Sequence, residues 1–326
     1  ESFHQPLFAL VYNNRPLSTL IFILLIFLFS IFYILSLWLV AKKRLEIRRL
    51  KLLIGLTVGI FFLSYPGFSY DIFNYIFTAK VTFFYHENPY LVMPIEFIGD
   101  PNLAFTRAAN KIALYGPSWI MLTSIPYLLG LQNIILTIFS FKLFITIFYL
   151  LTVWLIWKMS KSLVSLALFA LNPLVIIETL VSAHNDIVMM FFALLAFYLL
   201  QKKKIFLAII ILLTSILIKY ATLFLIPVFA FVLIQTWQDK KVNWVSVFHL
   251  SGWSMLVILL LSPLREELFP WYVIWVLIFA VLVPKKRILL AISLTLSFTA
   301  LLRYTPVLYT GSYFGITPLV RELVTF

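Results

Sequence analysis

The sequence predicts an all-α fold, a polytopic bundle of about ten membrane-spanning helices, and three observations support this class. Of the 326 residues, 63% are hydrophobic and only 11% are charged, and the mean hydropathy is +1.06. A water-soluble chain of this length needs far more polar surface. Apolar runs recur along the chain, and basic residues cluster in the short connectors between them. We therefore predict that residues 1–326 form a single transmembrane domain.

Basic residues mark one side of the membrane. Sixteen of the 25 lysines and arginines fall in five connectors, and the only acidic residues in or directly beside them are Glu46 and Asp239. The connectors are residues 42–51, 158–161, 202–204, 240–241 and 285–287. They occur at every second connector, which is the positive-inside pattern. The net charge of +13 is thus a topology signal, with anionic membrane lipids as the partner. The basic residues form no single stripe, so the sequence disfavours nucleic-acid binding.

The predicted elements follow from this topology. Polar residues 1–17 lie outside, a first span covers residues 18–41, and a second span at 52–65 returns to the outer face. Segment 117–130 is apolar but short, and we place it on or partly in the outer leaflet. The remaining spans are 132–157, 163–182, 186–201, 205–219, 221–236, 243–262, 270–283 and 288–303. Both termini are then extracytoplasmic. Because the first residue is Glu1 and not Met, we expect a processed chain or an excerpt.

A long segment at residues 64–131 separates the second span from the third. Loops of more than about 15 residues are usually functional or disordered, and many Phe and Tyr residues here argue against disorder. We predict an ordered extracytoplasmic loop that carries the catalytic carboxylate Asp71. If residues 71–85 are helical, Asp71 and Lys80 lie on roughly opposite faces and form no ion pair.

The surroundings of Asp71 are aromatic and close to the membrane interface. Such surroundings disfavour the charged form of a carboxylate, which suits a general base. The plain alternative is a solvated loop aspartate or a helix N-cap.

Three interruptions of the apolar runs, at residues 182–186, 219–221 and 262–271, face outward in this topology. Broken helices at membrane depth are tolerated where they line a cavity, so we expect a cavity that opens outward. Ionisable residues at these breaks are candidates for function: His184, Asp186, Glu178, Lys219 and Arg303. A polar hairpin turn is the alternative for residues 182–187.

Other polar residues have simpler interpretations. One histidine and one carboxylate are too few ligands to indicate a metal, so a divalent metal is possible but not indicated and no cofactor is assured. Arg265, Glu266 and Glu267 precede an aromatic corner. We interpret Lys142 as a packing or polar-contact residue and His249 as an interhelical hydrogen-bonding residue.

Six stretches together resemble the GT-C superfamily of integral-membrane glycosyltransferases, and most of all the polyprenol-phosphate-mannose-dependent mannosyltransferases. They are YDIFNY at 70–75 with a basic residue at 80, NPY at 88–90, YGPSW at 115–119, NP with Glu178 and HND at 172–186, PWY with Trp275 at 270–275, and Arg303-Tyr304 with YTG at 309–311. They cover residues 64–315. Family members often carry Arg where this chain has Lys80.

The resemblance implies an outer active site that transfers a sugar, mannose by analogy, from a polyprenyl-phosphate donor to a glycan or lipid-glycan hydroxyl. Asp71 would be the base of an inverting single displacement. Binding of the donor phosphate or substrate would involve Lys80, His184, Asp186, Lys219 and Arg303. Supporting residues would be Asn88, Tyr90, Tyr115, Glu178, Trp271 and Tyr272. The protein would lie in the cytoplasmic membrane with its site facing outward.

The alternative function is a transporter or flippase of a lipid-linked sugar or another anion. Inverted repeats and charges at mid-membrane depth would favour it. A non-enzymatic scaffold would leave Asp71 and Asp186 without a role.

Overall fold

The computed structural model describes residues 13–264 and 267–326, and within them every regular element is helical, as predicted. The α-helices are α2 (Arg15–Ala41), α3 (Ile47–Phe62), α4 (Asp71–Phe83), α5 (Pro117–Leu129), α6 (Ile134–Ser160), α7 (Leu163–Ala170), α8 (Pro173–Val175), α9 (Asp186–Gln201), α10 (Ile205–Ile216), α11 (Ile226–Trp237), α12 (Trp244–Leu261), α13 (Val273–Ala280), α14 (Arg287–Leu302), α15 (Tyr304–Thr310) and α16 (Thr317–Thr325). The shorter helical turns are η1 (Pro94–Glu96), η2 (Pro101–Phe105), η3 (Ile176–Val181), η4 (Tyr220–Leu225), η5 (Ser262–Leu264) and η6 (Pro270–Tyr272). Most of the predicted outer segment 1–17, and the pair Arg265 and Glu266, lie outside the described residues.

Membrane-spanning helices are present, although fewer meet the length of a full span than the sequence predicts. Within residues 13–264 and 267–326, five helices are long and apolar enough to cross a membrane. They are Arg15–Ala41, Ile134–Ser160, Tyr220–Trp237, Trp244–Leu264 and Arg287–Thr310. A sixth results if α7 and the following helix, which meet at 49°, count as one bent span. A helix lies at each of the ten predicted positions, but α3, α9, α10 and α13 are short, so ten spans stay a prediction.

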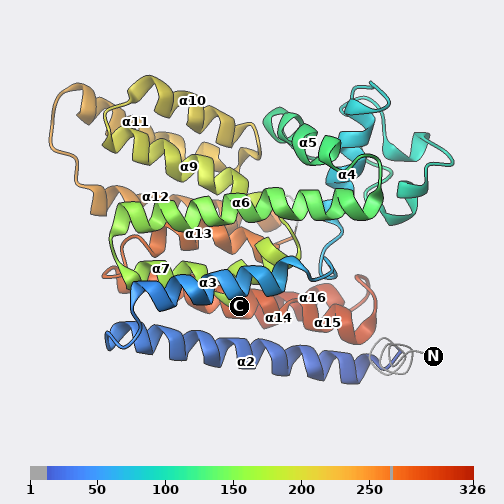
Figure 1. The fold of residues 1–326 in the computed structure, drawn as a ribbon, viewed down its shortest axis with the longest axis horizontal. Coiled ribbons are helices and arrows are strands. Elements are labelled where there is room, and N and C mark those ends of the chain that lie inside the picture. The colour runs from blue at the N-terminus through green and yellow to red at the C-terminus, as the bar shows by residue number, and fades with distance from the viewer. Residues whose placement is uncertain (1–12, 265–266) are drawn as a thin grey trace.

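The long helices lie along the longest axis of the molecule (Figure 1). The segment at residues 64–131, predicted to be extracytoplasmic and called the outer loop below, lies at one end of them. Helices α4 and α5 lie at the end of the bundle where α2 begins, and α4 packs on α5 and on the adjoining part of α6. At the other end, α9 packs between α10 and α6. Residues after the second predicted span thus return to cover one end of the bundle.

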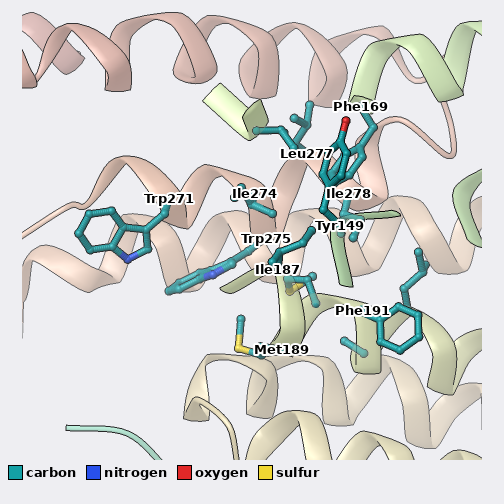
Figure 2. Close-up of a cluster of buried hydrophobic side chains, with 14 of the residues drawn as sticks. Tyr149, Phe169, Ile187, Met189, Phe191, Trp271, Ile274, Trp275, Leu277 and Ile278 are labelled. Carbon is teal, nitrogen blue, oxygen red and sulfur yellow. The ribbon is translucent and has the colours of Figure 1, made fainter. Parts of the chain in front are cut away.

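Two segments form the buried centre. Every residue from 165 to 191 and from 270 to 281 is buried, which is expected of helices that are apolar on all faces. Figure 2 shows side chains of both segments in one cluster, where Ile187 and Met189 of α9 lie near Ile274 and Trp275. Trp271 and Trp275 lie at one side of this cluster. The polar residues of the 182–186 break are therefore surrounded by protein.

A buried lysine fixes the end of α3. Lys142 of α6 is 1% exposed, and its ammonium donates to the Phe61 carbonyl at 3.1 Å and to the Ser64 hydroxyl at 3.2 Å. It also contacts the Ser64 carbonyl. Because the last carbonyls of a helix lack partners within it, this ammonium stabilises the end of α3 just before the outer loop. The prediction of a polar-contact role for Lys142 is confirmed.

The prediction for His249 is wrong. The Trp253 indole N–H donates to His249 Nε2 at 3.0 Å, and both residues belong to α12. Residues four apart on a helix are neighbours, so the bond is made within one helix and not between two.

The outer loop is ordered by its own hydrogen bonds, as predicted. The Ala113 amide donates to the Pro89 carbonyl at 2.7 Å, and the Ile95 amide donates to the Ala109 carbonyl at 2.9 Å. Asn88 Oδ1 accepts from the Tyr90 amide at 3.0 Å, which fixes the turn at NPY. These bonds close the loop on itself over the end of the bundle.

Gly116 joins this loop to the break after α10. The Gly116 and Ser118 amides donate to the carbonyls of Ile218 and Leu217 at 3.1 and 3.0 Å. The free amides at the start of α5 and the free carbonyls at the end of α10 thereby satisfy each other. A Cβ on Gly116 would lie 2.1 Å from the Leu217 carbonyl oxygen, so only glycine permits this contact.

We predict that Gly116→Ala lowers stability by about 1–3 kcal/mol, because a methyl group is forced against backbone. The melting temperature of the purified protein in detergent measures the effect. Gly55→Ala in α3 is the matched control, since nothing lies within 4 Å of its added Cβ and alanine favours a helix. Equal melting temperatures for the two variants would contradict the proposed contact.

Candidate active site

The site is built on an irregular stretch between α7 and α9. Asn172 Oδ1 accepts from the Leu174 and Val175 amides at 3.0 and 3.3 Å and starts α8. The chain then widens into the π-helix η3, a form found mostly at functional sites, which carries Glu178. It ends at Ala183, whose φ of 58° lies in the left-handed region and costs about 1–2 kcal/mol for a residue other than glycine. This turn places His184 beside Glu178, and the His184 amide donates to the Glu178 carbonyl at 2.9 Å.

A line of polar side chains begins at Asp71. The Oδ2 atom of Asp71 lies 3.3 Å from Nδ1 of His184, and Nε2 of His184 lies 3.2 Å from Oε2 of Glu178. The Tyr304 hydroxyl donates to Oε1 of Glu178 at 3.0 Å. His184 and Glu178 have no exposed side-chain surface, whereas 28% of the Asp71 side chain is exposed. Of the three ionisable residues Asp71, His184 and Glu178, only Asp71 meets solvent.

The ring of His184 is held from its face. It stacks on Trp271 with 3.6 Å between ring centroids and 21° between planes. Trp271 in turn stacks on Phe269 at 4.6 Å. Aromatic packing therefore holds the face of the imidazole. A carboxylate oxygen lies within ion-pair distance of each ring nitrogen, but neither contact has the geometry of a hydrogen bond.

A second charged group lies on the other side of the break. Lys219 Nζ lies 3.1 Å from Oδ1 and 3.3 Å from Oδ2 of Asp186, and the Trp275 indole N–H donates to Asp186 Oδ1 at 2.6 Å. The ammonium also lies 4.5 Å from the ring centroid of Tyr272 and 5.5 Å from that of Trp275. The Lys219 side chain keeps 25% of its surface exposed, but Asp186 keeps none. This lysine therefore offers a positive charge to solvent while a carboxylate and two aromatic faces hold it.

Tyr75 connects the outer loop to the break. Its hydroxyl accepts from the Asn185 amide at 3.3 Å, and its ring packs edge-on against Tyr115 and Trp119. Tyr90 supports the same corner, because its hydroxyl donates to the Tyr115 carbonyl at 2.8 Å. The outer loop is thus packed directly over residues 182–186.

The pKa of Asp71 is shifted in the direction opposite to the one predicted. Burial acts to raise the pKa of Asp71, but contact with His184, the charge of Lys219 and the Tyr75 hydroxyl outweigh it, so the pKa is lowered. The sequence predicted that the charged form would be disfavoured, and this was wrong because the cations come from distant segments. Burial likewise acts to lower the pKa of His184, yet Asp71 and Glu178 raise it from 6.5 to about 9.

Seven predicted site residues are brought together in two neighbouring groups. The residues are Asp71, Glu178, His184, Asp186, Lys219, Trp271 and Tyr272. Tyr115 and Tyr90 lie one layer behind them, and Asn88 shapes the turn before Tyr90. Their chemical roles stay predictions.

Lys80 belongs to neither of the two groups, because it forms an ion pair elsewhere in the outer loop. Its ammonium lies 2.6 Å from Oδ2 of Asp100, whose side chain is 1% exposed, and the Tyr85 hydroxyl donates to the same oxygen at 2.6 Å. Asp100 also accepts from the Asn102 amide at 2.8 Å. Burial acts to raise the pKa of Asp100, but the contacts from Lys80 and Tyr85 outweigh it and lower the pKa. Lys80 therefore ties α4 to η2 within the outer loop.

Arg303 also points elsewhere. Its guanidinium donates to the Arg321 carbonyl at 3.0 Å and to the Thr325 hydroxyl at 2.7 Å, and lies 3.7 Å from Glu267. It is 2% exposed and holds α16 against the bundle. Its neighbour Tyr304 contacts the site in its place.

Three site residues were not among those predicted from sequence: Tyr75, Trp275 and Tyr304. Helical spacing offered a signal for two of them, since Tyr75 follows Asp71 by four residues and Trp275 follows Trp271 by four. Tyr304 offered no spacing signal, because its partner Glu178 is 126 residues away, although it stands in the Arg303-Tyr304 stretch that resembles the family. A fourth residue, Asn185, was missed as a site residue although it stands in the HND stretch. It is 1% exposed, and its side-chain amide finds no hydrogen-bond partner among the described residues.

Nothing in the part of the chain that the structure describes groups three or more histidine, aspartate or glutamate side chains so that they could hold a metal ion. Both nitrogens of His184 face carboxylates at 3.2–3.3 Å. The metal requirement therefore stays a prediction made from the sequence, in which a divalent metal is not indicated.

Comparison with protein families identifies a relationship over most of the chain. Residues 2–235 match the model of the MptA_B family, described as alpha-(1->6)-mannopyranosyltransferase, N-terminal domain. The matched segment includes Asp71, Glu178, His184, Asp186 and Lys219. No curated protein and no solved structure matches the chain.

We predict that His184 makes stability depend on pH. A histidine with a raised pKa stabilises the folded state fully below its unfolded pKa of 6.5, and this contribution is lost as pH rises through about 9. The melting temperature should therefore fall more for the unaltered protein than for His184→Gln between pH 6.5 and 9. His249→Gln should follow the unaltered protein. Parallel curves for all three proteins would contradict a protonated His184.

Proposed function

Because the chain belongs to the MptA_B family, it is a mannosyltransferase of the GT-C type, and we propose that it takes mannose from a polyprenyl-phosphate donor. The observation that carries this proposal is that a partly exposed carboxylate, Asp71, and a partly exposed cation, Lys219, both contact the break at residues 182–186, through His184 and Asp186 respectively. A base and a phosphate-binding charge are the two groups that this transfer needs. An enzyme also accounts for the ionised residues better than the transporter considered above.

Lys219 is the proposed ligand of the donor phosphate. When the anomeric carbon–oxygen bond breaks, the phosphate oxygen takes the electron pair, and a nearby cation stabilises the charge. A phosphate leaves without protonation, so no general acid is needed. Lys80 and Arg303 are engaged with Asp100, Thr325 and backbone, which leaves Lys219 as the cation of choice. Asp186 and Trp275 hold its ammonium in place.

Asp71 is the proposed base for the acceptor hydroxyl. Its carboxylate is ionised at neutral pH, because its pKa is lowered, and it keeps an exposed edge. The hydroxyl oxygen bonds to the anomeric carbon while its proton passes to Asp71. No cofactor is required in this scheme.

We propose that the acceptor is a glycan or lipid-linked glycan reached from the extracytoplasmic side of the cytoplasmic membrane. The aromatic outer loop and the positive-inside pattern of the sequence support this orientation. The family description supports an α-(1→6) linkage, in which the attacking group is a primary sugar hydroxyl.

The central test is transfer from radiolabelled polyprenyl-phosphate mannose to a panel of hydroxyl acceptors. We predict that Asp71→Asn lowers the rate by about 10²–10⁴-fold, the usual effect of losing a general base. Asp239→Asn is the matched control, because the Asp239 side chain is 81% exposed and lies in a connector, and it should keep full activity. Transfer that survives Asp71→Asn undiminished eliminates the proposed base.

The stereochemistry gives an independent prediction. A single displacement inverts the anomeric carbon, so an α-linked product requires a β-linked donor. We therefore expect transfer from the β-anomer of a synthetic polyprenyl-phosphate mannose and none from the α-anomer. Efficient use of the α-anomer, with retention in the product, would show that the reaction is not a single displacement.

A further inference from the structure

The buried carboxylate Glu178 has no role in the transfer as described so far. Its side chain has no exposed surface, so it reaches neither donor nor acceptor. Both of its oxygens are nevertheless engaged, Oε2 with His184 at 3.2 Å and Oε1 with the Tyr304 hydroxyl at 3.0 Å. A buried negative charge is costly unless it is neutralised, so a carboxylate at this depth needs a cation beside it.

The geometry of His184 supplies that cation. Each of its ring nitrogens lies 3.2–3.3 Å from a carboxylate oxygen. In a neutral imidazole one nitrogen carries a lone pair and no proton, and that lone pair would face a negative oxygen. Only the imidazolium carries a proton on both nitrogens and a positive charge that attracts both carboxylates.

We propose that Glu178 is a positioning residue for the transfer reaction: it keeps His184 as an imidazolium and holds its positive charge beside Asp71. His184 then has a different role from the phosphate or sugar contact predicted from sequence. This inference rests on the proposed function only where it concerns Asp71 as the base.

The charges around His184 are consistent with this role. Facing it are Asp71 from α4 and Glu178 from η3, with the uncharged Trp271 of η6 on its ring. One step further out lie Tyr304, which donates to Glu178, and Lys219, which is paired with Asp186. Tyr75 also lies near Asp71. Two carboxylates thus share one imidazolium, and the pKa of about 9 keeps His184 protonated at neutral pH.

The arrangement has a consequence for the base. An imidazolium alone beside Asp71 would hold the carboxylate ionised but would weaken it as a proton acceptor. Glu178 attracts the same imidazolium charge from the opposite side of the ring, so this charge stabilises the Asp71 carboxylate less strongly. Asp71 is therefore fixed in place and ionised, and part of its basicity is retained for the acceptor proton.

The test measures the protonation of His184 directly. The chain has four histidines, and replacing His4, His86 and His249 with glutamine leaves His184 as the single one. Nitrogen NMR of ¹⁵N-histidine-labelled protein in nanodiscs then follows its titration. We expect an imidazolium at neutral pH, and a midpoint lowered by about 1–2 pH units when Glu178→Gln is added. An identical midpoint with and without Glu178 overturns the proposal.

Kinetics supply the second measurement. Glu178→Gln should lower kcat by about tenfold or more and move the basic limb of the pH–rate profile to lower pH, with KM for the donor within about twofold. A merely structural role would lower activity equally at every pH. Tyr304→Phe removes one hydrogen bond to Glu178 and should produce the same changes in weaker form, which keeps the test informative if Glu178→Gln does not fold.

The two proposals fail separately. If the unaltered protein transfers no mannose from a polyprenyl phosphate, the proposed function is wrong and the NMR result still decides the role of Glu178. If transfer occurs and needs Asp71, but the pH profile and the His184 midpoint of Glu178→Gln match the parent, then Glu178 is not a positioning residue.

Discussion

The imidazole of His184 lies between two carboxylates, and the surrounding site depends on this contact. It lies inside a stretch, residues 165–191, with no exposed residue, where an unpaired charge costs several kcal/mol. Glu178 and Asp71 therefore cannot be placed freely, because each must meet the same ring. The π-helix η3 and the left-handed backbone of Ala183 turn the chain so that His184 lies beside Glu178. The outer loop is fixed in turn, because Asp71 must reach His184 from α4.

Buried cations have different tasks in this protein. Lys142 stabilises the end of α3, Lys80 ties α4 to η2, and Arg303 holds α16. Lys80 and Lys219 each pair with one carboxylate and lie near two aromatic rings, but the Lys80 side chain is 15% exposed and the Lys219 side chain is 25% exposed. Lys219 is therefore the most exposed of these four cations, which supports its proposed role as the ligand of the donor phosphate.

The sequence predicted the helices and much of the site, and its errors have physical causes. Hydropathy and basic connectors located a helix at each proposed span, but they do not show which short helices cross the membrane. Ionisable residues at apolar breaks identified His184, Asp186 and Lys219, because such residues are rare in these surroundings. Lys80 and Arg303 were misplaced because their partners, Asp100 and the α16 residues, are distant in sequence. The pKa of Asp71 was predicted in the wrong direction for the same reason.

The two backbone hydrogen bonds between residues 116–118 and 217–218 make the segment before Lys219 a continuation of the outer loop. Each bond contributes about 1 kcal/mol, and Gly116 allows the two chains to lie in direct contact. The proposed base Asp71 and the proposed phosphate ligand Lys219 thus belong to one mechanical unit. In the proposed reaction, a movement that lifts the loop to admit the acceptor would also draw the Lys219 ammonium away from the leaving phosphate. Substrate entry and charge stabilisation would thereby be coupled.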